Sequence, residues 1–316
     1  MNNVKILQGD CIESMKGMDA GSVNCCVTSP PYFGLRDYGC DGQIGLEDTP
    51  EAFVQKLVDV FREVKRVLRD DGTVWLNLGD SYAGSGKGSN PDGTPHPSSL
   101  TGKQGTHKGT TEGTKPIQKA KDIGLKPKDL IGIPWRVAFA LQADGWYLRQ
   151  DIIWHKPNPM PESVTDRCTK SHEYIFLLSK SKKYYYDHEA IKEPHTTEVP
   201  KKKRDKSKEG YGKAFLSPLG KGERTGYGEN GRNKRSVWTV NTKPYKGAHF
   251  ATFPEKLILP CILAGCPKGG VVLDPFGGSG TTAEVARKQG RGAVLCELNG
   301  EYIPLIKKRL EQQLLF

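Results

Sequence analysis

The chain has 316 residues, a formal net charge of +11 and a pI of about 9.1, and its length is enough for one large α/β domain with an appendage. The longest apolar run, residues 257–266, is too short to cross a bilayer, and residues 1–5 have no apolar segment of a secretory signal. The eight cysteines include no CxxC pair, and no histidines cluster at metal-ligand spacing, so we expect a cytoplasmic protein without a membrane partner or a bound metal.

The first 80 residues alternate strand and helix patterns. Residues 23–27 form a short apolar run that predicts a strand. The segment 49–51 (Thr-Pro-Glu) is typical of a helix N-terminus, and apolar residues then recur on one helical face as far as Leu68. We expect this helix to end near Gly72 and residues 73–78 to form a buried strand. A helix between two strands predicts a βαβ unit with parallel strands.

Two polar segments, 83–128 and 191–236, interrupt this pattern and carry net charges of +5 and +7, while the rest of the chain is close to neutral. They contain too few large apolar side chains to build a core. We therefore expect both to be inserts in one domain formed by residues 1–190 and 237–316. Because phosphates are neutralised locally, such concentrated charge indicates a polyanionic partner, and solvated loops remain the alternative.

The remaining segments continue the alternation of helices and strands. Between the inserts the patterns predict a helix that ends at Gly145, a strand at 151–155, and an antiparallel pair of strands at 172–178 and 183–187. After the second insert they predict a helix at 253–265, a strand at 271–273, a helix to 289, a strand at 293–296 and a last helix. This order predicts an α/β fold with a doubly wound, mostly parallel sheet.

The segment 273–282 (Leu-Asp-Pro-Phe-Gly-Gly-Ser-Gly-Thr-Thr) lies between a predicted strand and a predicted helix. Its glycines allow a tight turn and a close approach of the backbone to a ligand at the helix N-terminus. Glu297 follows Asp274 by 23 positions and ends the next predicted strand, which suits a carboxylate that binds ribose hydroxyls. The third glycine of a dinucleotide fingerprint is missing, and Gly86-Lys87 lacks the first glycine and the Ser/Thr of a Walker A loop. A plain glycine turn is the alternative.

The segment 28–32 (Thr-Ser-Pro-Pro-Tyr) directly follows the first strand of the predicted βαβ unit. Its two prolines stiffen the backbone, and an aromatic ring follows at once. A hydroxyl, a rigid carbonyl and a ring together suit a planar ligand that carries an NH₂ group. On these residues alone, a proline-rich strand exit with a packed tyrosine is an equal alternative.

Together these two segments resemble the DNA amino-methyltransferases, which modify N4 of cytosine or N6 of adenine. The resemblance implies a class I S-adenosylmethionine-dependent methyltransferase fold in which Ser29, Pro30, Pro31 and Tyr32 form the catalytic motif. Because this motif precedes the cofactor loop, the order is similar to that of the circularly permuted β group. Segments 7–11, 154–158, 171–174 and 249–254 also resemble family segments around the cofactor and the target pocket. The implied S-adenosyl-L-methionine ligands are Asp10, Cys11, Phe250, Thr252, Asp274, Phe276, Gly277, Gly278, Gly280, Thr281 and Glu297.

The resemblance also implies a mechanism. The base leaves the duplex, Tyr32 stacks on it, and its NH₂ group donates to the Ser29 hydroxyl and the Pro30 carbonyl, which favours a pyramidal nitrogen with a localised lone pair. Serine in the first motif position is more typical of N4-cytosine enzymes and aspartate of N6-adenine enzymes, so we expect cytosine, with adenine as the alternative.

Double-stranded DNA is the expected partner, and a cognate restriction endonuclease is a further one that the family allows. We expect the 191–236 insert to recognise the target, because basic groups there flank Tyr211, Phe215 and Tyr227. The expected DNA-binding residues are Lys201, Lys202, Lys203, Arg204, Arg232, Lys234 and Arg235.

Two other classes of enzyme and one non-enzyme are the alternatives. A cytosine-C5 methyltransferase needs a cysteine nucleophile, and the only Pro-Cys pair, Pro260-Cys261, lies in an apolar helical run without a Gly-Pro lead-in. An RNA or small-molecule methyltransferase has no need of such large basic inserts. A non-catalytic DNA-binding module would explain the charge, but it would leave the intact Ser-Pro-Pro-Tyr motif and the glycine loop without a purpose.

Overall fold

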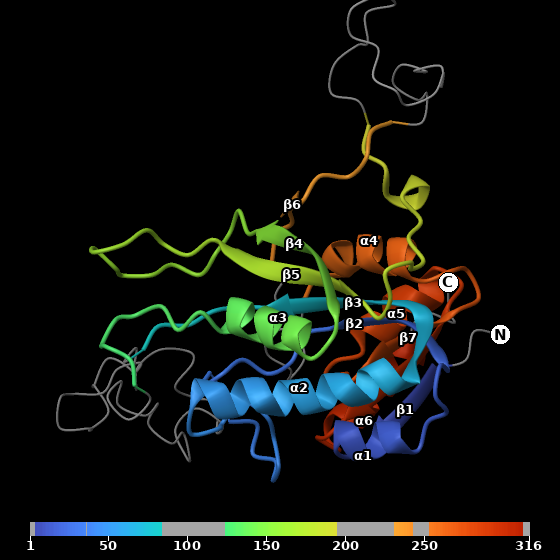
Figure 1. The fold of residues 1–316 in the computed structure, drawn as a ribbon, viewed down its shortest axis with the longest axis horizontal. Coiled ribbons are helices and arrows are strands. Elements are labelled where there is room, and N and C mark those ends of the chain that lie inside the picture. Colours follow the sequence, from blue (N-terminus) through green and yellow to red (C-terminus); the bar gives the residue numbers. More distant parts are fainter. Residues whose placement is uncertain (1–3, 36, 84–123, 195–230, 243–252, 312–316) are drawn as a thin grey trace, which may run out of the picture.

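The protein is described by a computed structural model that covers residues 4–35, 37–83, 124–194, 231–242 and 253–311. These residues form one mixed sheet of eight strands in the order β1-β8-β7-β2-β3-β5-β4-β6, with helices on both faces (Figure 1). The first five strands in this order are mutually parallel, and β5 is antiparallel to both of its neighbours. The strands are β1 (Val4–Gln8), β2 (Val23–Thr28), β3 (Leu68–Leu78), β4 (Tyr147–His155), β5 (His172–Ser179), β6 (Val237–Thr239), β7 (Val271–Asp274) and β8 (Gly292–Glu297).

The helices cover the two faces of the sheet in two groups. One apolar core joins the sheet to α1 (Cys11–Lys16), α2 (Pro50–Val67) and α3 (Ile133–Ala143). A second core joins the opposite face to α4 (Glu255–Gly265), α5 (Thr281–Lys288) and α6 (Tyr302–Glu311). This arrangement confirms the predicted doubly wound α/β architecture, and it leaves the carboxyl ends of the parallel strands open for a site.

The predicted βαβ unit is formed by β2, α2 and β3, with the two strands parallel. Thr49 caps α2 as its sequence indicates, since its side chain accepts a hydrogen bond from the backbone N–H of Ala52 at 3.1 Å. The helix ends at Val67, five residues before the predicted Gly72, because the chain has already joined the sheet at Leu68.

The strand predicted at 183–187 is absent, and the expected antiparallel pairing with 172–178 was wrong. Both edges of β5 are already occupied, by β3 on one side and by β4 on the other. The segment instead crosses the sheet towards α4, where the backbone N–H of Asp187 donates to Ala264 O at 2.9 Å. Its aromatic residue Tyr186 stacks on Trp75, with ring centroids 6.2 Å apart.

Most of both predicted inserts lies outside the described residues, but the points where they leave and rejoin the domain are described. A bridge between Tyr82 and Leu130 closes the base of the first insert, and a bridge between Glu193 and Arg232 closes the base of the second. Each insert therefore leaves and returns at a single place on the domain. Among the described helices, none combines the length and apolar character needed to span a membrane.

Candidate functional site

A cavity lies at the edge of the sheet where β1, β8, β7 and β2 end, and both predicted segments line it. Gly280 does not contribute to the lining of this cavity, and Phe250 and Thr252 lie outside the described residues. The predicted residues that do line it are Asp10, Cys11, Ser29, Pro30, Pro31, Tyr32, Asp274, Phe276, Gly277, Gly278, Thr281 and Glu297.

Asp274 is fully buried at the end of β7 and ties three segments together. Its carboxylate accepts hydrogen bonds from the hydroxyls of Thr28 and Thr282 at 2.6 Å each, and from the backbone N–H of Phe276 at 3.1 Å. Burial raises its pKa to about 7. Asp274 therefore fixes the glycine loop against the strand that leads into the Ser-Pro-Pro-Tyr segment.

Glu297 and Asp10 bring two further carboxylates to the cavity. The Glu297 carboxylate accepts from the backbone N–H of Gly278 at 2.6 Å and of Asn299 at 2.8 Å, and its burial raises its pKa. Asp10 caps α1 by accepting from the N–H of Ile12 at 2.9 Å. A carboxylate oxygen has two lone pairs, so both groups retain acceptor capacity for ligand hydroxyls or amines.

The glycine loop combines a left-handed backbone conformation with close packing against its neighbours. Gly280 has φ = 79°, and a Cβ there would lie 2.9 Å from the Cγ2 of Ile306 in α6. A Cβ on Gly277 would lie 3.0 Å from the Cβ of Leu295 in β8. Both positions therefore leave little room for a larger side chain, and Gly280 acts on the site only through the loop.

Tyr32 is held in one orientation by its ring and by its hydroxyl. The ring lies against the backbone of Gly79, where a Cβ would be 2.5 Å from the tyrosine Cε2. The hydroxyl donates to Glu173 Oε2 at 2.7 Å and also hydrogen-bonds with the side chain of Ser29. Burial and the Glu173 carboxylate raise the pKa of Tyr32 well above its usual value, so the phenol keeps its proton.

Glu173 is the centre of this network. Besides Tyr32, it accepts from Asn77 Nδ2 at 3.1 Å and forms an ion pair with Lys156. The Lys156 ammonium also lies 4.3 Å from the ring centroid of Trp154. The segments 154–158 and 171–174, which resemble family segments around the target pocket, thus meet at the tyrosine of the predicted catalytic motif.

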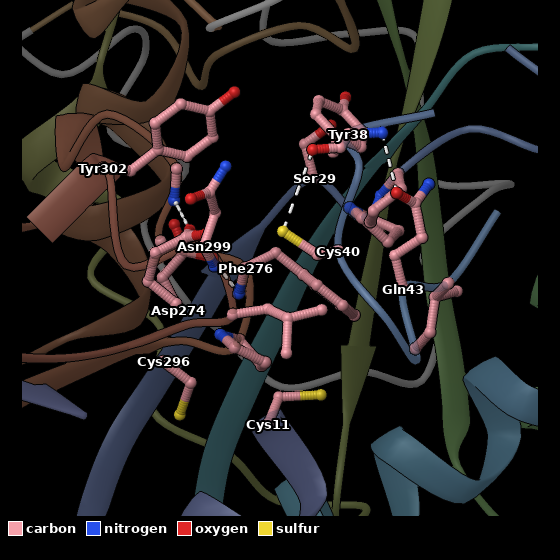
Figure 2. Close-up of a pocket in the computed structure, with 18 of the residues that line it drawn as sticks. Cys11, Ser29, Tyr38, Cys40, Gln43, Asp274, Phe276, Cys296, Asn299 and Tyr302 are labelled. Atoms are coloured by element: carbon pink, nitrogen blue, oxygen red, sulfur yellow. Dashed lines mark hydrogen bonds between the residues drawn. The ribbon is translucent and has the colours of Figure 1, made fainter. Parts of the chain in front are cut away.

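Residues on two sides of the cavity were not predicted from the sequence. Figure 2 shows Asn299 and Tyr302 on one side and Tyr38, Cys40 and Gln43 on the other. The second group belongs to a short irregular segment in which the Tyr38 N–H donates to Gln43 Oε1 at 2.7 Å. No periodicity or motif marks this segment, whereas the position of Tyr302, shortly after Glu297, was a signal that could have been used.

The predicted DNA-binding residues are only partly described, since Lys201, Lys202, Lys203 and Arg204 lie outside the described residues. Arg232, Lys234 and Arg235 gather around Glu193, with nitrogen-to-oxygen distances of 3.5, 3.3 and 3.8 Å. The Arg235 side chain is 68% exposed, against 27% for Arg232 and 20% for Lys234. Arg235 is therefore the member of this group that is most open to a partner.

The position of Cys261 does not support it as an alternative nucleophile. Cys261 is buried within α4, away from the lining of the cavity, and burial raises its thiol pKa. Among the described residues, no three His, Cys, Asp or Glu side chains are grouped to hold a metal ion.

The residues of the cavity fit S-adenosylmethionine. Asp10 and Glu297 are carboxylates suited to ribose hydroxyls and to positive charge, and Phe276 offers an apolar surface to a flat heterocycle. The cavity continues directly to Ser29 and Tyr32, which also line it and offer a hydroxyl and an aromatic ring to a second planar ligand. This fold and this cavity are those of a class I methyltransferase that uses S-adenosylmethionine.

Comparison with known proteins identifies the family within that class. Residues 23–308 match the family described as DNA methylase (N6_N4_Mtase), and the chain belongs to this family. It is 49% identical over 310 residues to the type II methyltransferase M.SmaI of Serratia marcescens, covering 98% of this chain and 91% of that protein. It is 47% identical over 311 residues to the type II methyltransferase M.Cfr9I of Citrobacter freundii, covering 98% and 89%.

Solved structures share the fold. The PvuII DNA methyltransferase, described as cytosine-N4-specific, superposes with a TM-score of 0.63 at 16% identity, covering 98% of this chain and 86% of that one. A Thermus thermophilus protein complexed with S-adenosyl-L-methionine superposes with a TM-score of 0.56 at 22% identity, covering 98% and 95%. The predicted fold, family and enzyme class are confirmed, and S-adenosylmethionine is the cofactor. The roles of the individual site residues stay predictions.

Proposed function

We propose that this protein is a type II DNA methyltransferase that modifies N4 of cytosine in double-stranded DNA. One observation carries the proposal: Ser29, the first residue of the Ser-Pro-Pro-Tyr segment, lines the same cavity as the cofactor loop. Serine at this position favours cytosine over adenine, and N6-adenine is the alternative. The order of the two segments along the chain supports membership of the permuted β group.

Ser29, Pro30 and Tyr32 hold the target amine. The Ser29 hydroxyl and the Pro30 carbonyl accept its N–H groups, which favours a localised lone pair on a nitrogen that is otherwise a poor nucleophile. Tyr32 presents a ring that Gly79 and Glu173 already fix, so little conformational entropy is lost when the base stacks on it. S-adenosylmethionine supplies an electrophilic methyl group. No buried general base is needed, because the methylated ammonium is acidic enough to lose a proton to water.

Asp10, Phe276 and Glu297 orient the cofactor in this proposal. Glu297 and Asp10 accept hydrogen bonds from its hydroxyl or amino groups, and Phe276 contacts its heterocycle. Asp274 acts indirectly, because its carboxylate is engaged by Thr28, Thr282 and the backbone of Phe276. Its contribution is to hold the cofactor loop and the catalytic segment in register.

The 191–236 insert contacts DNA in this proposal, and Arg235 is its most available described cation. Arg232 and Lys234 are held by Glu193 at the base of the insert, where they stiffen the point of attachment. Lys201–Arg204, outside the described residues, would add phosphate contacts. A cytoplasmic location and a cognate restriction endonuclease complete the proposal, and the type II relatives support the second.

The experiment is expression in a host that lacks DNA methylation, followed by sequencing of the host DNA with detection of modified bases. We expect N4-methylcytosine at one recurring sequence, much less of it with the Tyr32→Ala variant, and none in the host that carries the empty vector. N6-methyladenine at that sequence would transfer the proposal to the alternative base. Unmodified DNA from a host that contains folded wild-type protein would refute DNA methylation.

A further inference from the structure

The loop that joins β4 to β5, residues 156–171, extends beyond the edge of the sheet (Figure 1). Met160 lies in this loop and is 71% exposed, which makes it the most exposed large apolar side chain of the described residues. Leaving a methionine in water forgoes the stabilisation that burial of its apolar surface would give. A side chain placed in this way is available to contact a partner molecule.

The loop around Met160 is braced. On one side, Asn158 exchanges two hydrogen bonds with the backbone of Thr242, at 3.0 and 3.2 Å. On the other side, Arg167 pairs with Glu162 at 2.7 Å and lies 3.9 Å from the ring centroid of Tyr82. The loop is therefore fixed to the domain at both ends.

Prolines restrict the backbone at the tip itself. Pro159 and Pro161 flank Met160, and each fixes its own φ and restricts the residue before it. The methionine side chain is therefore the adaptable part of a stiff tip, since it is unbranched and fits irregular spaces.

The stem of this loop begins at the proposed catalytic segment. Lys156, four residues before Met160, is ion-paired with Glu173, and Glu173 accepts the Tyr32 hydroxyl. His155 and His172, which end β4 and begin β5, are register partners at the same edge of the sheet as the cavity. A duplex that delivers a base to Ser29 must lie over this edge, and the tip of the loop then faces it.

We infer that Met160 enters the base stack of the DNA and fills the gap that the extruded base leaves. This inference rests on the proposed function, because only an enzyme that extrudes its target creates such a gap. Extrusion costs a few kcal/mol of lost stacking and pairing. An apolar side chain that enters a base step replaces part of the lost contact, and methionine is one of the residues that proteins use in this way.

The test compares Met160→Ala with wild type on two unmethylated duplexes that contain the recognition sequence of the enzyme. In the first duplex the target base is paired, and in the second it faces an abasic position and is already unpaired. On the paired duplex we expect kcat/KM to fall on the order of tenfold, the equivalent of about 1.4 kcal/mol of burial. On the unpaired duplex we expect the variant to stay within about twofold of wild type, because there is less extrusion to support.

Tyr147→Ala is the matched control, since Tyr147 is 45% exposed and begins β4, the strand that leads into the loop, at the edge of the sheet opposite the cavity. This variant should match wild type on both duplexes. Wild-type kcat/KM for Met160→Ala on the paired duplex would overturn the inference, and so would an equal loss on both duplexes. If wild-type protein methylates neither duplex, the proposed function has failed, and the inference fails with it.

Discussion

Asp274 lies in the cofactor loop, and its observed hydrogen bonds are all to other residues of the protein. Two threonine hydroxyls and one backbone N–H donate to its buried carboxylate, so Asp274→Ala would leave buried donors without a partner, at about 1–3 kcal/mol each. Weaker cofactor binding by that variant could therefore arise from a disturbed cofactor loop as well as from the loss of a direct contact with the cofactor.

The pKa of Asp274 makes stability depend on pH in a specific direction. Burial raises this pKa from 3.8 to about 7, so between these values the folded protein holds a proton that the unfolded chain has released. The contribution of protonated Asp274 to the free energy of unfolding is complete below about pH 4 and is lost as the pH rises through 7. Denaturant titrations at pH 4.5 and 7.5 measure the effect. Between these two pH values the free energy of unfolding of wild type should fall by more than that of Asp274→Asn. Parallel pH profiles for the two proteins would contradict this.

Tyr32 and Glu173 should act as one unit in catalysis, because the carboxylate fixes the phenol through a 2.7 Å hydrogen bond. Hydrogen bonds to charged groups contribute about 1.5–3 kcal/mol, so Tyr32→Phe should lower kcat roughly tenfold or more without changing cofactor affinity. Glu173→Gln keeps an acceptor and should be milder than Glu173→Ala. In the Tyr32→Phe background, Glu173→Gln should have little further effect on kcat. Additive losses of kcat in this double-mutant cycle would show that the two residues act independently.

At the scale of elements, the site depends on how closely the glycine loop and α5 pack against α6. Gly280 and Gly269 share a left-handed backbone, with φ of 79° and 80°. A Cβ on Gly280 would contact Ile306, whereas a Cβ on Gly269 would meet no atom within 4 Å. The two glycines therefore separate the cost of the backbone conformation from the cost of overpacking.

Gly269→Ala should destabilise the protein by about 1–2 kcal/mol through backbone conformation alone. Gly280→Ala should cost about 1–3 kcal/mol more, because the methyl group enters the space of Ile306, and cofactor affinity should fall with it. Chemical denaturation of both variants measures the difference. Equal losses for the two would show that the packing of α6 does not constrain the loop.

At the scale of the whole molecule, the positive charge should govern DNA affinity through salt. Arg235→Ala removes an exposed charge from the second insert, so the slope of log affinity against log salt should become less steep by about 0.9 if one phosphate contact is lost. The unfolding free energy should stay near that of wild type. Lys308→Ala, an exposed lysine of α6, is the control and should keep the wild-type slope. An unchanged slope for Arg235→Ala would remove this residue from the proposed DNA contact.

The fold followed from sequence where local signals and tertiary packing agree. Thr49 and Pro50 marked the start of α2, and the apolar run at 271–273 marked β7. Residues 183–187 were misjudged because a strand also needs a free sheet edge, which no local pattern reports. Similarly, the sequence placed Ser29 and Glu297 in the candidate site, but the contribution of Glu173 depends on strands β3 and β5 being neighbours.

We propose that one cavity has a cofactor end and a base end, and that the Ser-Pro-Pro-Tyr segment serves the base end. The most direct measurement determines cofactor affinity and single-turnover methyl transfer on the same Tyr32→Ala protein. We predict a Kd for S-adenosylmethionine close to that of wild type and a transfer rate reduced about 100-fold, because the base loses its fixed stacking partner. Wild-type transfer by Tyr32→Ala would contradict the account, and so would a loss explained entirely by weaker cofactor binding.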